Sequence, residues 1–227
     1  MNASIVVIVP AHNEAPIIAS TLERLIELNY SVVVVDDGSV DNTWEVITGL
    51  NVFALRHPIN LGQGAAIQTG TTFALRNGAE IIVHFDADGQ HKAEDIEVLI
   101  EPLLAEQADV VFGSRFLRKA DAQLVPALRR LLLKTGILVN ALSTGVWLSD
   151  AHNGFRALTA AAAKKIEICE NGYAHASEIV RQVHTLGLRF TERPTTIVYT
   201  DYSKAKGQSM WNALNIVFDL LLRRILQ

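Results

Sequence analysis

Two carboxylates, Asp86 and Asp88, follow the apolar run of residues 81–85 with one residue between them. At this spacing, and at the end of a buried strand, both side chains can reach one divalent cation. Mg²⁺ and Mn²⁺ take oxygen ligands, and Mg²⁺ usually shares them between protein carboxylates and substrate phosphates. Gly89 allows a tight turn behind the two acids. The segment therefore predicts a Mg²⁺ or Mn²⁺ site that binds a nucleoside diphosphate.

Further polar turns follow other apolar runs of the chain. Glu14 comes shortly after the run of residues 5–9, and Asp37 comes after the run of residues 32–35. A glycine-rich turn covers residues 60–64. A carboxylate after a strand can hydrogen-bond a base or a ribose hydroxyl. The alternatives are turn formation and helix capping for the Asp37 turn, and a favourable helix dipole for Glu14.

Short β-branched runs alternate with amphipathic stretches through the first half of the chain. We expect strands over residues 5–9, 32–35, 52–55, 81–85 and 110–112. We expect helices over residues 17–28, after Asp41, over residues 62–75 and over residues 96–104. This alternation predicts an α/β fold with a mostly parallel sheet and helices on both faces. Ligands of such sheets bind at the carboxyl ends of the strands, so Glu14, Asp37 and the two metal carboxylates should share one rim.

The composition narrows the class of protein. The chain has 227 residues, a formal net charge of −4 and one cysteine, Cys169. This length fits one large α/β domain, and the single cysteine excludes an internal disulfide. The acidic balance argues against nucleic acid as a partner. Residues 1–4 lead into a predicted strand without the features of a signal peptide, so we expect the chemistry on the cytoplasmic side.

Two apolar segments stand apart from the alternating pattern. Residues 128–148 carry Arg129, Arg130 and Lys134 near one end, and residues 210–226 form a helical pattern with one polar stripe. Charges and glycines argue against a spanning helix in the first segment, so we expect amphipathic helices at a membrane interface. The three basic residues would hold a lipid phosphate there or bind anionic headgroups. A core helix pair with a solvated basic edge is the alternative.

These patterns predict how the chain is divided. We expect a catalytic domain over residues 1–205, which includes the amphipathic segment 126–148, and a C-terminal amphipathic helix over residues 206–227. That helix would face the membrane, a small membrane protein or a second copy of the chain. The expected location is peripheral, on the cytoplasmic inner face of the membrane.

Six segments resemble the family 2 inverting glycosyltransferases of GT-A fold, and they occur in the family order over roughly residues 4 to 202. The matching segments are Val9-Pro10-Ala11-His12-Asn13-Glu14, Asp36-Asp37-Gly38-Ser39-Val40-Asp41, Asn60-Leu61-Gly62-Gln63-Gly64, residues 86–91, Gly113-Ser114-Arg115-Phe116 and Asp150-Ala151-His152-Asn153-Gly154-Phe155-Arg156. Within the family, the chain is most similar to dolichyl- and polyprenyl-phosphate sugar synthases. Those enzymes move a sugar from GDP-mannose or UDP-glucose to a lipid phosphate.

The resemblance implies donor-side roles for individual residues. The residues that would line the nucleoside pocket are Pro10, His12, Glu14, Val35 and Asp37. The residues that would hold the metal and the diphosphate are Asp86, Asp88 and Gln90, with Ala87 also at the nucleotide sugar. Lys204 resembles a lysine near the donor phosphates.

The resemblance also implies an acceptor side. Arg115 resembles an arginine that faces the phosphates or the acceptor, and its planar fork suits bidentate pairing with phosphate oxygens. Asp150 lies where related enzymes place an acceptor-side acid, so we expect Asp88, Arg115 and Asp150 to be catalytic. The lipid-phosphate synthases carry a further arginine just upstream of the Ser-Lys pair, and residues 198–202 supply none. A Gln-x-x-Arg-Trp segment is also absent, which argues against a processive polysaccharide synthase.

The acceptor decides how the nucleophile is activated. A polyprenyl phosphate is already largely dianionic at pH 7 and needs no strong general base. A sugar hydroxyl on a glycolipid or a surface polysaccharide must lose a proton, and Asp150 is then the expected base. A different class of protein remains open, namely a catalytically silent subunit of a membrane glycosylation complex. A nucleotidyltransferase is disfavoured because residues 10–14 form no glycine-rich basic loop.

Overall fold

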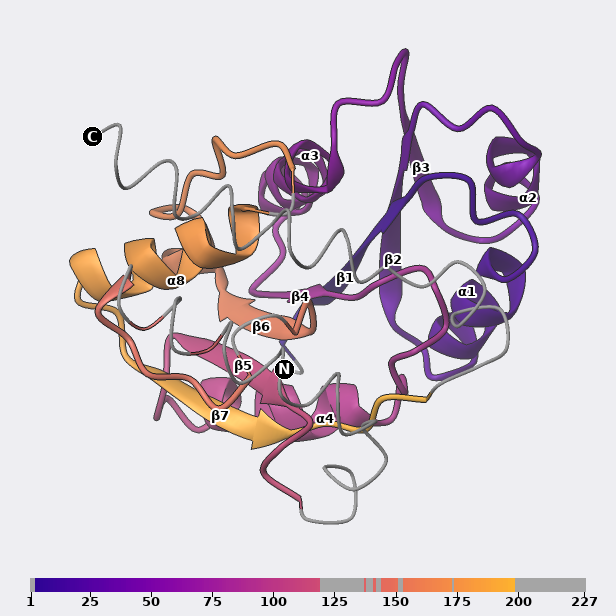
Figure 1. Ribbon diagram of the computed structural model, residues 1–227. Helices are drawn as coiled ribbons and strands as arrows, with labels where there is room; N and C mark the ends of the chain where they lie inside the picture. Colours follow the sequence, from indigo (N-terminus) through magenta and orange to yellow (C-terminus); the bar gives the residue numbers. More distant parts are fainter. Residues whose placement is uncertain are drawn as a thin grey trace.

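The computed structural model describes residues 3–118, 137, 141, 144–150, 153–172 and 174–198. These residues form one seven-stranded sheet with the spatial order β3-β2-β1-β4-β6-β5-β7 (Figure 1). The strands are β1 (Ile5–Ala11), β2 (Ser31–Asp37), β3 (Phe53–His57), β4 (Ile81–His84), β5 (Val110–Ser114), β6 (Arg156–Thr159) and β7 (Phe190–Pro194). Six strands share one direction, and β6 runs antiparallel to its neighbours β4 and β5.

Helices cover both faces of the sheet, with α3 and α8 together on one side in Figure 1. The helices are α1 (Ile18–Glu27), α2 (Thr43–Thr48), α3 (Gln63–Arg76), α4 (Asp95–Leu104), α7 (Ala160–Ala163) and α8 (His175–Thr185). Strand side chains alternate between the two faces. Val7 and Val9 accordingly pack with α1, α2 and α4, whereas Val6 and Ile8 pack with α3 and α8. The predicted doubly covered, mostly parallel sheet is confirmed.

The five predicted strands and the four predicted helices are all present. Strands β2 and β3 extend beyond their apolar runs because Asp36 and Asp37 still pair with Arg56 and His57 of β3. Strands β6 and β7 and helices α7 and α8 lie beyond the predicted alternation. The sheet is therefore larger than the one that the apolar runs indicate.

The topology brings the predicted polar turns to one edge of the sheet. Strands β1, β2 and β4 are parallel neighbours, so the residues that follow their carboxyl ends meet there. Strand β5 points the same way and adds Arg115 to this edge. Strand β6 runs in the opposite direction, so its amino end brings Gly154 and Arg156 to the same rim.

Several predictions fall outside the described residues. Most of the segment 126–148 and all of the segment 206–227 lie there, together with Arg129, Arg130, Lys134 and Lys204. The domain boundary at residue 205 therefore stays a prediction. Within the described ranges, no helix combines the length and the apolar character needed to cross a membrane.

Candidate active site

The acidic turn after β4 holds its two carboxylates in different ways. Asp86 Oδ1 accepts a hydrogen bond from Gln63 Nε2 at 2.9 Å, and Asp86 Oδ2 lies 3.0 Å from His91 Nε2. Asp88 accepts the main-chain N–H of Gln90 at 3.0 Å and the side-chain amide of Gln90 at 2.5 Å. Asp86 is thus fixed to the start of α3, whereas Asp88 is held within its own turn.

The surroundings shift the pKa values of Asp86 and Asp88 in opposite directions. Burial acts to raise the pKa of Asp86, but the hydrogen bond to His91 and the charges of His91 and Arg156 outweigh it and leave that pKa below its ordinary value. Burial and the negative charge of Asp86 raise the pKa of Asp88. Two like charges in one turn disfavour ionising both acids, and a bound cation would relieve this repulsion.

The oxygens of this turn suit a hard divalent cation. Asp86, Asp88 and Gln90 offer carboxylate and amide oxygens, which are the ligand types that Mg²⁺ and Mn²⁺ prefer. The described residues contain no group of three or more His, Cys, Asp or Glu side chains that could hold a metal ion. A Mg²⁺ ion held by two carboxylates commonly takes further ligands from substrate phosphates and water.

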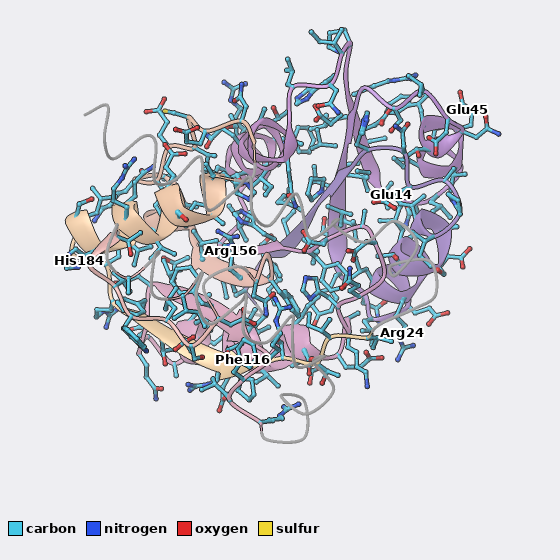
Figure 2. All side chains as sticks on the ribbon, viewed as in Figure 1. Glu14, Arg24, Glu45, Phe116, Arg156 and His184 are labelled. Carbon is cyan, nitrogen blue, oxygen red and sulfur yellow. The ribbon has the colours of Figure 1, made fainter. Side chains whose placement is uncertain are left out.

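Hydrogen bonds join the turns after β1 and β2. His12 Nδ1 lies 2.8 Å from the main-chain oxygen of Asp37. The N–H of Glu14, which is labelled in Figure 2, donates to Thr43 Oγ1 at 2.8 Å. The two turns therefore form one connected surface beside the acidic turn, as the rim prediction requires.

Both oxygens of the Asp37 carboxylate already form hydrogen-bond contacts within the protein. Its Oδ1 lies 2.7 Å from His57 Nδ1 and accepts the Leu61 N–H at 2.9 Å, and its Oδ2 accepts the Gly62 N–H at 2.7 Å. The side chain fastens the glycine-rich turn to the end of β2. A hydrogen bond from Asp37 to a base or ribose would have to replace or share one of these contacts.

Arg115 and Asp150 form a buried ion pair at the end of β5. Asp150 Oδ2 accepts hydrogen bonds from Arg115 Nε at 2.6 Å and from the Arg115 main-chain N–H at 3.1 Å. The preceding residue, Ser149, donates its N–H and its hydroxyl to Glu192 Oε1 at 2.8 and 2.7 Å. Burial raises the pKa of Glu192, and the charge of Asp150 adds to that rise. Strands β5 and β7 thus fix the loop that carries Asp150.

A buried polar cluster lies beside Asp86, on the face of the sheet that α3 and α8 cover. Arg156 stands opposite His84 in the β4–β6 register, and His84 Nε2 lies 3.3 Å from Thr71 Oγ1 of α3. Burial, and then the charge of Arg156, lower the pKa of His84 well below its ordinary value and that of His175 to about 4. Burial lowers the pKa of Arg156 to about 10. At pH 7 the two imidazoles are neutral and the guanidinium is charged.

Gly154 lies directly against Asp86, and this contact gives a first prediction. A Cβ at Gly154 would stand 2.6 Å from Asp86 Oδ2 and 2.9 Å from Oδ1, so an alanine must displace the carboxylate. We expect Gly154→Ala to weaken Mn²⁺ binding by about tenfold, because a small displacement of one ligand spoils the geometry of the site. Isothermal titration with MnCl₂ measures the change.

Gly172→Ala is the matched control, because a Cβ at Gly172 meets no atom within 4 Å. We expect this variant to bind Mn²⁺ like the unmodified protein. Equal Mn²⁺ affinity of Gly154→Ala and Gly172→Ala would contradict a role for Asp86 as a metal ligand.

The predicted site residues fall into three sets. Those at the rim are His12, Glu14, Asp37, Asp86, Asp88, Gln90, Arg115 and Asp150. The side chain of Val35 is fully buried in the core, Pro10 and Ala87 are also buried, and a contact from Val35 to a nucleoside would have to come from its main chain. The basic residues Arg129, Arg130, Lys134 and Lys204 lie outside the described ranges.

Four further residues belong to this site on structural grounds. They are Gln63, His91, Arg156 and Glu192. The first three lie inside the motifs that carry the family resemblance. Their polar side chains within those motifs could have marked them as site residues. Glu192 has no such signal, because its contact to Ser149 joins residues that are far apart in the sequence.

Sequence comparison places this site in a known family. A family model described as glycosyl transferase family 2 matches residues 6–166. A UDP-N-acetylglucosamine–dolichyl-phosphate N-acetylglucosaminyltransferase of Methanococcus voltae is 30% identical over 97% of this chain and 96% of that protein. An undecaprenyl-phosphate mannosyltransferase of Micrococcus luteus is 29% identical over 89% of this chain and 86% of that protein.

Structural comparison agrees at the level of the fold. Glucosyl-3-phosphoglycerate synthase from Mycobacterium tuberculosis, crystallised with Mn²⁺, UDP and glucosyl-3-phosphoglycerate, superposes with a TM-score of 0.70. The match covers 98% of this chain and 80% of that chain at 20% sequence identity. The expected GT-A fold is confirmed.

Proposed function

The chain belongs to glycosyl transferase family 2 and is a glycosyltransferase, and from this membership we propose that it moves a sugar from a UDP- or GDP-sugar to a polyprenyl phosphate. The observation that carries the proposal is the acidic turn after β4, whose Asp86 and Asp88 share one rim with the turns after β1 and β2. In an α/β sheet, this rim is where nucleotides bind.

The donor side uses the oxygens of the acidic turn. Asp86, Asp88 and Gln90 would hold Mg²⁺ or Mn²⁺, which when bound acts as a Lewis acid and neutralises the charge of the departing diphosphate. Gln63 and His91 keep Asp86 oriented through their hydrogen bonds. His12 and Glu14, on the neighbouring turns, would face the nucleoside. Lys204 would approach the donor phosphates.

The acceptor side is built on the Arg115–Asp150 pair. The relatives from Methanococcus voltae and Micrococcus luteus are named for transfer to dolichyl phosphate and undecaprenyl phosphate, which supports a lipid phosphate as the acceptor. An arginine suits that ligand because it screens the charge of two approaching anions. Asp150 already accepts two hydrogen bonds from Arg115, so its role with this acceptor is to position the guanidinium. A glycolipid or surface-polysaccharide hydroxyl is the alternative acceptor, for which Asp150 would act as the base.

The two amphipathic segments would bring the enzyme to its lipid. Segments 126–148 and 206–227 would lie on the cytoplasmic face of the membrane, with Arg129, Arg130 and Lys134 toward the acceptor phosphate or the headgroups. The C-terminal segment would also serve to bind a small membrane protein or a second copy of the chain.

A donor and acceptor panel tests the proposal. UDP- and GDP-sugars are offered with Mg²⁺ or Mn²⁺, and the products are scored for hydrolysis, for transfer to a short polyprenyl phosphate and for transfer to a glycolipid hydroxyl. We expect metal-dependent transfer to the phosphate from one class of donor. Binding of no nucleotide sugar would overturn the proposal, and transfer to the hydroxyl alone would replace the lipid-phosphate acceptor with the alternative.

A further inference from the structure

We propose that Arg156, whose buried guanidinium lies against the Gly154 turn beside Asp86, supplies a fixed positive charge that helps to hold the diphosphate of the donor. This inference rests on the proposed donor chemistry. It adds a residue that lies behind the acidic turn and belongs to a different strand.

The place of Arg156 follows from the antiparallel pairing of β6 with β4. Arg156 is the first residue of β6 and stands opposite His84, the last residue of β4. Opposite residues of an antiparallel pair point to the same face. Both side chains therefore lie on the face covered by α3 and α8, and Asp86 follows His84 by two residues at the rim. Figure 2 labels Arg156 near the centre of the view.

A hydrogen bond places the guanidinium against the turn that touches Asp86. Arg156 Nε donates a hydrogen bond to the main-chain oxygen of Gly154 at 3.2 Å. The α-carbon of Gly154 in turn lies so close to Asp86 that a Cβ there would stand 2.6 Å from the carboxylate. Arg156, Gly154 and Asp86 thus form a chain of contacts from β6 to the proposed metal site.

The positive charge of Arg156 is unfavourable to bury. Its exposed fraction is 1%, and among the described residues it forms no ion pair within 4.0 Å. Burying a charge without a close partner is strongly unfavourable unless other groups compensate for it. The described group that compensates is the carboxylate of Asp86, whose charge raises the pKa of Arg156, whereas His84 and His175 are neutral and supply no negative charge. A diphosphate above Asp86 would provide the missing negative charge.

A fixed positive charge at this place has opposite effects on the two ligands of the site. It repels a divalent cation that binds to Asp86 and Asp88, and it attracts the diphosphate that binds with that cation. Removing the charge should therefore tighten the binding of the metal alone and weaken the binding of the nucleotide. A purely structural role predicts that both affinities fall together.

Arg156→Gln tests this sign difference, with Arg156→Lys as the conservative variant. Mn²⁺ is titrated without nucleotide, and UDP and GDP are titrated at saturating Mn²⁺. For Arg156→Gln we expect Mn²⁺ to bind about fivefold tighter and the preferred nucleotide to bind about tenfold more weakly. Changes of this size are expected when one unit charge near, but not touching, a charged ligand is removed. Arg156→Lys should give affinities between those of the unmodified protein and those of Arg156→Gln, because an ammonium keeps part of the charge although burial lowers the pKa of lysine readily.

Leu158→Ala is the matched control for damage to β6. Leu158 lies two residues along the same strand, is 2% exposed and packs in the core on the same face. We expect this variant to lower the thermal midpoint without tightening Mn²⁺. If Arg156→Gln does not fold, Arg156→Met, which keeps the apolar stem and removes the charge, carries the same expectation.

The outcomes separate this inference from the proposed function. Failure of the unmodified protein to bind UDP or GDP would overturn the proposed function. Normal nucleotide binding by the unmodified protein, together with parallel losses or no change in Arg156→Gln, would overturn the role of Arg156 alone.

Discussion

Replacing Asp88 by Asn is expected to lower the rate of sugar transfer by about a thousandfold, or about 4 kcal/mol of transition-state stabilisation. Asp88 is one of two carboxylates that can face a cation at the rim, and an amide carries no charge to hold it. The loss should occur without a loss of stability. Burial and the charge of Asp86 raise the pKa of Asp88, so its ionised form is disfavoured in the folded protein and Asn removes that unfavourable term at pH 7.

Transfer kinetics and the thermal midpoint, measured on the same preparation, check this expectation. The unmodified enzyme should lose activity in EDTA and regain it with Mg²⁺ or Mn²⁺, whereas Asp88→Asn should not respond to added metal. Asp109→Asn is the control, because Asp109 forms an exposed ion pair with Arg189 just before β5 and should tolerate the change. Unchanged transfer by Asp88→Asn would contradict metal-assisted catalysis through Asp88.

The rim itself could be predicted from the sequence, for a simple physical reason. The sequence of a buried parallel strand is a continuous run of apolar, mostly β-branched residues, and β1, β2 and β4 all have such a run. Once the runs are ordered in a parallel sheet, their carboxyl ends must share an edge. Glu14, Asp37 and Asp86 were therefore expected together although they are far apart in the chain.

The second half of the sheet could not be predicted in the same way. Strand β7 reads Phe-Thr-Glu-Arg-Pro, which has neither an apolar run nor a clear alternation. Among the described strands it pairs only with β5, so it lies at the edge of the described sheet. Strand β6 has four residues and begins with Arg156. A buried arginine at the start of a strand looks like a surface residue in the sequence, and its burial depends on neighbours from β4 and α8.

The role of Asp37 shows a different limit. Its type and position at the end of β2 suggest a nucleoside contact, and nothing local in the sequence argues otherwise. The carboxylate instead lies in hydrogen-bond contact with His57 and accepts the N–H groups of Leu61 and Gly62. Both amides are more than twenty residues from Asp37 in the sequence. A hydrogen bond to a distant main-chain amide depends on how the turn packs, so residue type alone does not reveal it.

The Arg115–Asp150 pair gives the second large expected effect. Replacing Arg115 by Met should lower transfer by about a hundredfold, or about 3 kcal/mol, because a charged donor at the acceptor site is lost. The same change leaves Asp150 buried at 2% exposure without its ion-pair partner. Breaking a buried pair in this way costs about 3–5 kcal/mol of folding free energy, so transfer must be measured well below the thermal midpoint.

Asp150→Asn distinguishes the two possible acceptors. If the acceptor is a polyprenyl phosphate, the nucleophile needs no base, and turnover by folded Asp150→Asn should stay within about tenfold of the unmodified enzyme. If the acceptor is a sugar hydroxyl, loss of the base should reduce turnover by a hundredfold or more. A large loss with the phosphate acceptor would mean that Asp150 does more than position Arg115.

The double variant separates stability from chemistry at this pair. Arg115→Met combined with Asp150→Asn leaves neither charge buried and unpaired, so it should regain much of the folding free energy that each single change removes. Transfer should nevertheless remain about a hundredfold below normal, because the guanidinium is still absent. Recovery of both stability and transfer would show that Arg115 acts only through folding, and loss of both would show that its neighbours Ser149 and Glu192 cannot hold the loop without the ion pair.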